Sequence, residues 1–163
     1  MGELYEFAEG TMSIGRLDEK SEGLLLLTTD GKVSNEMTSS KFEKEYYVQL
    51  DGIIDQNAIE TLENGVEIGI QGKVYKTFPA KVKAIDDPQF PERSRRVRDD
   101  RHGPTSWASV TIREGKYRQV RKMCAAVGFP VLRLVRVRIG GNHLGDLEVG
   151  EVKEVGKFEG VDL

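Results

Sequence analysis

Cysteine and histidine are scarce in this chain. Its 163 residues include one cysteine, Cys124, and two histidines, His102 and His143. A single cysteine excludes an internal disulfide, and the isolated histidines lack the Cys, His or carboxylate spacing that a zinc site needs. We therefore expect neither a disulfide scaffold nor a metal centre.

Long apolar runs and nucleotide-binding glycine patterns are also lacking. No apolar stretch approaches the roughly 20 residues of a membrane-spanning helix, and residues 1–7 have neither a basic start nor an apolar signal core. The glycines, Gly140-Gly141 included, form no phosphate loop or dinucleotide fingerprint, and a Gly-x-Ser-x-Gly elbow is missing. These absences predict a soluble, cytoplasmic protein that uses no cofactor.

Charge is distributed unevenly along the chain. The formal net charge is −3 and the isoelectric point is near 5.5. Residues 92–138 nevertheless carry 13 Lys or Arg against 4 Asp or Glu, a balance of +9, which leaves −12 for the rest. A basic face can gather phosphates whatever the total charge, so the low isoelectric point does not exclude a nucleic-acid partner. A solvated basic surface without a partner is the alternative.

The apolar pattern predicts one α+β domain with a largely antiparallel mixed sheet and flanking helices. A chain of 163 residues suits one compact core. Asp55 is expected to cap the second helix, Met123 and Cys124 to pack in the core, and Asp30 and Asp51 to form turns. Strands are predicted at 13–17, 24–29, 45–50, 66–70, 75–84, 106–113, 130–139 and 147–155, helices at 32–39, 54–63 and 117–127, and an arginine-rich exposed loop at 86–105.

An acidic residue stands in a polar turn between two apolar runs. The run GRLDEKSEGLLLLTTDG at 15–31 places Asp18 there. A turn side chain held between strands can face a substrate while its backbone stays fixed, as catalytic groups on loops do. An aspartate in such a turn is ordinarily only a turn former. Position alone therefore makes Asp18 a candidate and no more.

Three ordered motifs resemble one family. The run at 15–31 is followed by Lys44-Glu45-Tyr46 and, after Pro104-Thr105-Ser106-Trp107, by EGKYRQVRKMCAAVGFPVLRLVRVRIG at 114–140. Together they resemble the RsuA-type pseudouridine synthases, most closely the RluE-like members that modify large-subunit (23S) ribosomal RNA. The resemblance runs from about residue 14 to 155. It implies the pseudouridine synthase fold, with an active-site cleft across the sheet, and isomerisation of a specific uridine in ribosomal RNA.

The resemblance also implies the catalytic residues. Asp18 matches the catalytic aspartate, which could attack C1′ of the ribose, add to C6 of the flipped base, or assist a glycal route. Arg121 matches the basic residue that pairs with the aspartate, although by itself it reads as a solvated helix arginine. Tyr46 matches the tyrosine that packs on the flipped base and helps to remove the C5 proton. Tyr47 should face the opposite side of the strand and pack in the core.

Further basic and polar residues of the motifs are candidates for RNA contact. Arg16 and Arg118 could hold the RNA backbone or fill the space that the flipped nucleotide leaves. Lys44 could bind phosphate or be an exposed strand end. The remaining candidates are Gln119, Lys122 and Arg136. The expected partner is ribosomal RNA, bound by a monomer without a metal ion.

Family members usually have more sequence ahead of the first motif than the 14 residues that precede Gly15 here. We therefore expect residues 1–163 to be a single catalytic domain, with its first strand region truncated or supplied differently and without a separate N-terminal RNA-binding domain. Two other functions remain open. One is a noncatalytic RNA-binding or ribosome-assembly module, and the other is a hydrolase that releases free uracil through Asp18.

Overall fold

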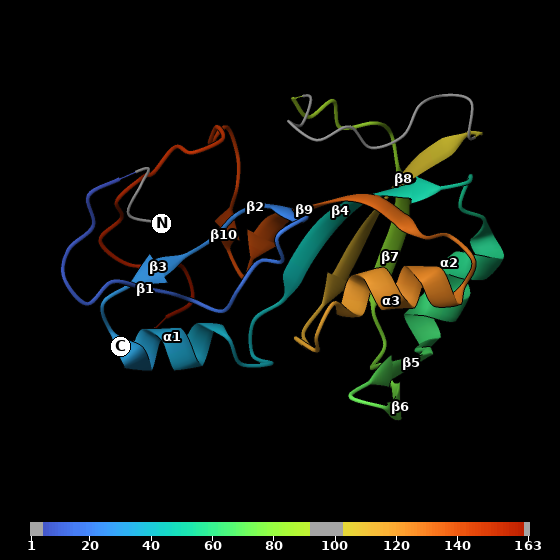
Figure 1. The fold of residues 1–163 in the computed structure, drawn as a ribbon, viewed down its shortest axis with the longest axis horizontal. Coiled ribbons are helices and arrows are strands. Elements are labelled where there is room, and N and C mark those ends of the chain that lie inside the picture. Colours follow the sequence, from blue (N-terminus) through green and yellow to red (C-terminus); the bar gives the residue numbers. More distant parts are fainter. Residues whose placement is uncertain (1–4, 92–102, 162–163) are drawn as a thin grey trace.

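The computed structural model describes residues 5–91 and 103–161, and Figure 1 shows how their elements are arranged. Most of the predicted elements are present. In chain order they are β1 (Met12–Ser13), β2 (Glu22–Gly23), β3 (Leu27–Thr28), α1 (Gly31–Met37), β4 (Lys44–Asp51), α2 (Gln56–Asn64), β5 (Glu67–Ile70), β6 (Lys73–Lys76), β7 (Lys81–Ile85), β8 (Thr105–Ile112), α3 (Gln119–Ala126), β9 (Val131–Ile139) and β10 (Asn142–His143).

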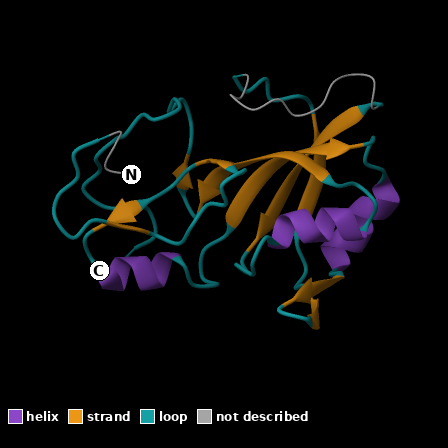
Figure 2. Ribbon diagram, in the orientation of Figure 1, coloured by secondary structure: helices purple, strands orange, loops and turns teal. Residues whose placement is uncertain are grey.

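A mixed, largely antiparallel sheet occupies the centre of the molecule (Figure 2). Its strand order is β10-β9-β4-β8-β7, and the short strand β2 runs parallel to β9. The long strand β4 pairs antiparallel with β8 on one side and β9 on the other. Apolar and polar residues alternate along β4, as a strand with one face on the core requires. The predicted α+β fold class is confirmed.

Helices α2 and α3 cover one face of this sheet and enclose the main core (Figure 1). Asp55 caps α2 by accepting a hydrogen bond from Ala58 N at 2.8 Å, as the sequence predicted. Met123 and Cys124 of α3 are buried, and burial raises the pKa of the Cys124 thiol to about 12. The main core comprises Val48, Leu50, Ile54, Ala58, Ile59, Leu62, Val66, Ile68, Ala80, Val82, Ala108, Val110, Ile112, Val120, Met123, Cys124 and Leu134.

A second apolar cluster lies at the other end of the molecule, around α1, β1 and β3 (Figure 1). Asp30 begins α1 by accepting a hydrogen bond from Lys32 N at 2.8 Å, so this residue is a helix cap and not the hairpin turn that the sequence suggested. The second cluster comprises Ile14, Leu24, Leu26, Met37, Phe42, Ile139 and Val161. The chain therefore has two apolar centres, and β9 contributes Leu134 to the main core and Ile139 to the second cluster.

Four predicted strands are wrong. The run 13–17 contributes only Ser13, the last residue of β1. The run 24–29 contributes only β3, which pairs with β1, and its first residue, Leu24, bonds through its N–H to Arg136 O at 2.8 Å. The run 75–84 is divided between β6, which pairs with β5, and β7, which pairs with β8. Residues 147–155 form turns and irregular, exposed backbone, and β10 ends the sheet. In each case the strand partner decided the outcome, and local alternation does not reveal partners.

Most of the predicted arginine-rich loop at 86–105, namely residues 92–102, lies outside the described residues. Its first part is anchored on the face of the sheet away from the main core, where Phe90 packs against Tyr47 and Trp107 with ring centroids 6.1 and 5.8 Å away. Within residues 5–91 and 103–161, none of the helices has the length and apolar character that crossing a membrane requires.

Candidate active site

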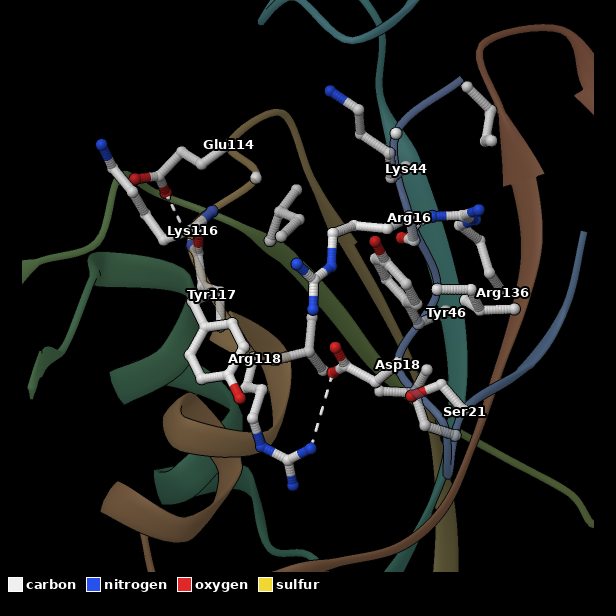
Figure 3. Close-up of a pocket in the computed structure, with 18 of the residues that line it drawn as sticks. Arg16, Asp18, Ser21, Lys44, Tyr46, Glu114, Lys116, Tyr117, Arg118 and Arg136 are labelled. Atoms are coloured by element: carbon white, nitrogen blue, oxygen red, sulfur yellow. Dashed lines mark hydrogen bonds and ion pairs between the residues drawn. The ribbon is translucent and has the colours of Figure 1, made fainter. Parts of the chain in front are cut away.

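A cavity of about 400 Å³ lies where the main core meets the second cluster (Figure 3). Its apolar wall combines Ile14, Met37 and Ile139 of the second cluster with Ile112, Val120 and Leu134 of the main core. Its polar wall contains eight of the nine sequence-predicted site residues, namely Arg16, Asp18, Lys44, Tyr46, Arg118, Gln119, Arg121 and Arg136. The ninth, Lys122, instead contacts the ring of a lining residue, Tyr117.

Asp18 sits in a closed turn and faces a cation. The turn is fixed by a hydrogen bond from Ser21 N to Asp18 O at 2.9 Å. The carboxylate is 22% exposed, and its Oδ2 lies 3.6 Å from Nη1 of Arg118 (dashed line in Figure 3). The turn and the ion pair therefore hold this partly shielded carboxylate in a defined position at the cavity wall.

The sequence predicted that Arg121 pairs with Asp18, but in the structure Arg118 pairs with the Asp18 carboxylate and Arg121 bonds to the turn that carries it. Arg118 stands immediately before α3 with a φ of +50°, a left-handed conformation that directs its side chain toward Asp18. Arg121, one turn into the helix, donates from Nη2 to Lys20 O at 3.2 Å and to Ser21 Oγ at 3.0 Å. Arg121 therefore fastens the turn that carries Asp18, and Arg118 forms an ion pair with the Asp18 carboxylate.

Arg136 is a buried guanidinium at the floor of the cavity. Its side chain is 6% exposed, and its Nε donates to Leu24 O at 2.9 Å while Nη1 lies 3.5 Å from Arg16 O. Among the residues that the structure describes, Nη2 has no hydrogen-bond partner. An orphaned buried donor costs about 1–3 kcal/mol, so a cavity lined by such a group favours an occupant with an acceptor oxygen.

Lys44 and Gln119 are buried and internally bonded. Lys44 Nζ donates to Ser39 O and Arg113 O, each at 3.0 Å, so the alternative of an exposed strand end is wrong. Burial, then the charges of Arg136 and Arg113, lowers the pKa of Lys44 below its ordinary value of 10.5. Gln119 is 3% exposed and uses its amide to accept from Lys116 N at 3.2 Å. Both residues fix the cavity wall.

The two adjacent tyrosines of β4 face opposite sides of the sheet, as their alternation predicted. Tyr46 is half-buried, lines the cavity and packs against the main core. Tyr47 is also half-buried but lies on the other face, against Phe90. The expectation that Tyr47 belongs to the core is therefore wrong, because segment 86–91 provides a separate cover for that face.

Comparison with known proteins agrees with this geometry. A sequence model described as RNA pseudouridylate synthase matches residues 4–126, which is more than half of the chain. The chain belongs to the RNA pseudouridylate synthase family. The matched region contains the Asp18 turn, Tyr46 and all of α3, so the family's sequence pattern covers every residue that lines the cavity except Leu134, Arg136 and Ile139 of β9.

Two bacterial proteins and one solved structure illustrate the similarity. The chain is 48% identical over 143 residues to ribosomal large subunit pseudouridine synthase E of Vibrio parahaemolyticus, covering 86% of this chain and 58% of that protein. It is 34% identical over 148 residues to ribosomal large subunit pseudouridine synthase B of Bacillus subtilis, covering 90% and 54%. A crystal structure of a pseudouridylate synthase superposes with a TM-score of 0.73 at 34% identity, covering 91% and 58%. The chain thus spans somewhat over half the length of these relatives.

Sequence reasoning missed Glu114 as a residue of the pseudouridylate synthase cavity. This buried carboxylate accepts hydrogen bonds from Phe78 N at 2.8 Å, from Gln119 Nε2 at 3.0 Å and from the Tyr75 hydroxyl. It thereby ties the β5–β6 hairpin to the loop that carries Arg118. Its place at the head of the motif beginning EGKY was the available signal, but a glutamate beside three basic residues reads as surface.

Tyr75 is expected to ionise only at high pH. Its hydrogen bond to Glu114, then burial and the Glu114 charge, raises its pKa from 10.0 to about 12. Because the native state holds this proton more tightly than the unfolded chain, stability should fall as pH rises from about 10 to about 12. Ultraviolet difference titration should show one of the five tyrosines ionising late, and Tyr75→Phe should remove that step. Simultaneous ionisation of all the tyrosines would contradict the Glu114 bond.

Proposed function

We propose that this chain carries the catalytic unit of a pseudouridine synthase that converts a specific uridine of large-subunit ribosomal RNA to pseudouridine. The observation that carries the proposal is the Asp18 carboxylate, held in a cavity of about 400 Å³ with Arg118 at 3.6 Å and Tyr46 in the wall. The names of the relatives favour the large-subunit substrate. We further propose that the protein acts in the cytoplasm as a monomer, without metal or cofactor.

The reaction suits the groups present. Pseudouridine formation breaks the bond between N1 of uracil and C1′, rotates the base, and joins C5 to C1′. C5 loses a proton and N1 gains one, so the composition of the nucleotide does not change. There is no net oxidation or hydrolysis, so the chemistry needs a carboxylate, a proton acceptor and confinement. Asp18 would attack C1′, add to C6 or assist a glycal route. A uridine inside a helix cannot reach Asp18, so the target must be extruded or unpaired.

Tyr46 and the guanidinium groups would hold the extruded uridine. The Tyr46 ring can stack on the base, which is worth about 1–3 kcal/mol per base, and its hydroxyl can take part in removing the C5 proton. Arg118 would orient the Asp18 carboxylate through their ion pair. Arg16 and the orphaned Nη2 of Arg136 would supply N–H donors to phosphate or uracil oxygens.

Arg121, Lys44 and Gln119 have different roles in this proposal. Arg121 would position the Asp18 turn through Lys20 and Ser21. Lys44 would add positive potential to the wall, and both residues would add rigidity through the internal hydrogen bonds that they keep. Lys122, outside the wall, remains available for phosphate contact at the rim.

The direct test is to incubate the purified chain with unmodified large-subunit RNA transcript and map pseudouridine by carbodiimide labelling and primer extension. We expect a new stop at one or a few uridines. Release of free uracil would instead identify a hydrolase, and RNA binding without any stop would favour a noncatalytic module. Partly assembled ribosomal particles serve as a second substrate, because target choice depends on RNA shape.

A further inference from the structure

Tyr117 is an exposed aromatic residue at the edge of the cavity. Its ring is 60% exposed, yet the residue lines the cavity together with its neighbours Lys116 and Arg118. Figure 3 places Tyr117 on the opposite side of the cavity from Tyr46, with Asp18 between them. A nucleotide next to an extruded uridine would pass this edge.

The backbone on both sides of Tyr117 is fixed. On one side, the amide of Lys116 donates to Gln119 Oε1 at 3.2 Å, and Glu114 is bonded to Phe78 N. On the other side, Arg118 begins α3 and pairs with Asp18. The Tyr117 ring is therefore presented from a rigid loop, which lowers the entropic cost of using it to bind a ligand.

Lys122 supplies a positive charge against this ring. Its Nζ lies 5.2 Å from the Tyr117 centroid and donates to Gly69 O of β5 at 2.8 Å. The ammonium is thus held by the hairpin at a defined place beside the ring. An ammonium has three N–H donors, so one bond to Gly69 does not exhaust its capacity for phosphate.

We propose that Tyr117 and Lys122 form a subsite for an unpaired nucleotide that neighbours the target uridine. The Tyr117 ring stacks on the base of this nucleotide, and Lys122, with Lys116, contacts its phosphate. A purine offers more overlap with the ring than a pyrimidine does, so the subsite favours a purine at that position. The inference rests on the proposed function, because it takes the uridine in the cavity as its reference point.

The test compares Tyr117→Ala, Tyr117→Phe and a matched control, Phe78→Ala. Phe78 is 62% exposed and makes its bond to Glu114 through the backbone, so its ring is a similar exposed aromatic outside the cavity wall. Affinity for the transcript fragment that contains the mapped uridine, KM and kcat are measured for each. We expect Tyr117→Ala to raise Kd and KM by about 5- to 100-fold with kcat nearly unchanged, whereas Tyr117→Phe and Phe78→Ala stay near the wild-type values.

An abasic nucleotide on either side of the target uridine makes the test position-specific. At the stacked position it should weaken binding of the wild type and have little further effect on Tyr117→Ala. Additive losses at both positions, an unchanged KM in Tyr117→Ala, or a fall in kcat alone would overturn the subsite. Binding measured without turnover separates the two proposals, because a chain that makes no pseudouridine but loses affinity in Tyr117→Ala contradicts the function and not the stacking contact.

Discussion

Asp18→Asn is expected to lower the rate of pseudouridine formation by about 10⁴-fold or more, because an amide cannot replace the carboxylate to which we assign the first step of the proposed reaction. The fold should survive. The side chain is 22% exposed, and its ion pair with Arg118 at 3.6 Å is of the partly exposed kind that contributes about 1 kcal/mol or less. Single-turnover release of tritium from RNA labelled at C5 of uridine measures the rate, and circular dichroism melting checks the fold.

Asp30→Asn is the matched control for this substitution. Asp30 caps α1 through its side chain and lies outside the cavity, and asparagine caps helices as well as aspartate does. We expect this variant to keep full activity. If Asp18→Asn kept comparable activity and RNA affinity, the carboxylate would not be the group that initiates the reaction.

Gly23→Ala is expected to reduce the free energy of unfolding more than any substitution of an exposed residue in the turn that carries Asp18. An added Cβ would lie 2.2 Å from Arg136 O and 2.6 Å from Arg136 N, both backbone atoms of β9, and Gly23 has a φ of +108°. The clash falls on the β2–β9 ladder, in which Gly23 pairs with Arg136. Since paired backbone cannot move aside, the ladder should open and carry the Asp18 turn away from the cavity.

Gly10→Ala separates the two causes. Gly10 has a φ of +84°, and nothing lies within 4 Å of an added Cβ. The Gly10→Ala variant should therefore lose about 1–2 kcal/mol of folding free energy, from left-handed backbone strain alone. Gly23→Ala should lose at least about 2 kcal/mol more through overpacking, together with most of its activity. Denaturant unfolding measures both. Equal losses in the two variants would mean that β2 can shift away from β9 without consequence.

The sequence predicted elements well where the signals are local. Helix α2 has a capping aspartate, Asp55, and a glycine, Gly65, just past its end, and both are found in those roles. The strand β8 lies where it was expected, although its last six residues are all buried and its two faces therefore do not alternate in exposure. The run of four leucines, 24–27, has no such internal signal. Its residues are divided between contacts with β9, the second cluster and β1, and only the folded topology reveals that division.

The same limit applies to the site. The motifs brought Asp18 and Tyr46 to one cavity, but they could not distinguish Arg118 from Arg121 as the partner of Asp18. Those two arginines are three residues apart, and the left-handed φ of +50° at Arg118 decides which way its side chain points. Burial was equally hidden, because a lysine such as Lys44 beside other charged residues gives no sign that its ammonium is satisfied by two carbonyls.

The position of the cavity between two apolar centres has a consequence for heat inactivation. Asp18 follows Ile14 of the second cluster, whereas Arg118 precedes a helix of the main core. The Asp18 carboxylate and the Arg118 guanidinium therefore stay in contact only while the second cluster is packed against the main core. Loosening of the second cluster would abolish the proposed activity while α2 and α3, which contain most of the helical residues described, stay folded. On heating, the proposed activity should therefore be lost at a lower temperature than the helical circular dichroism signal.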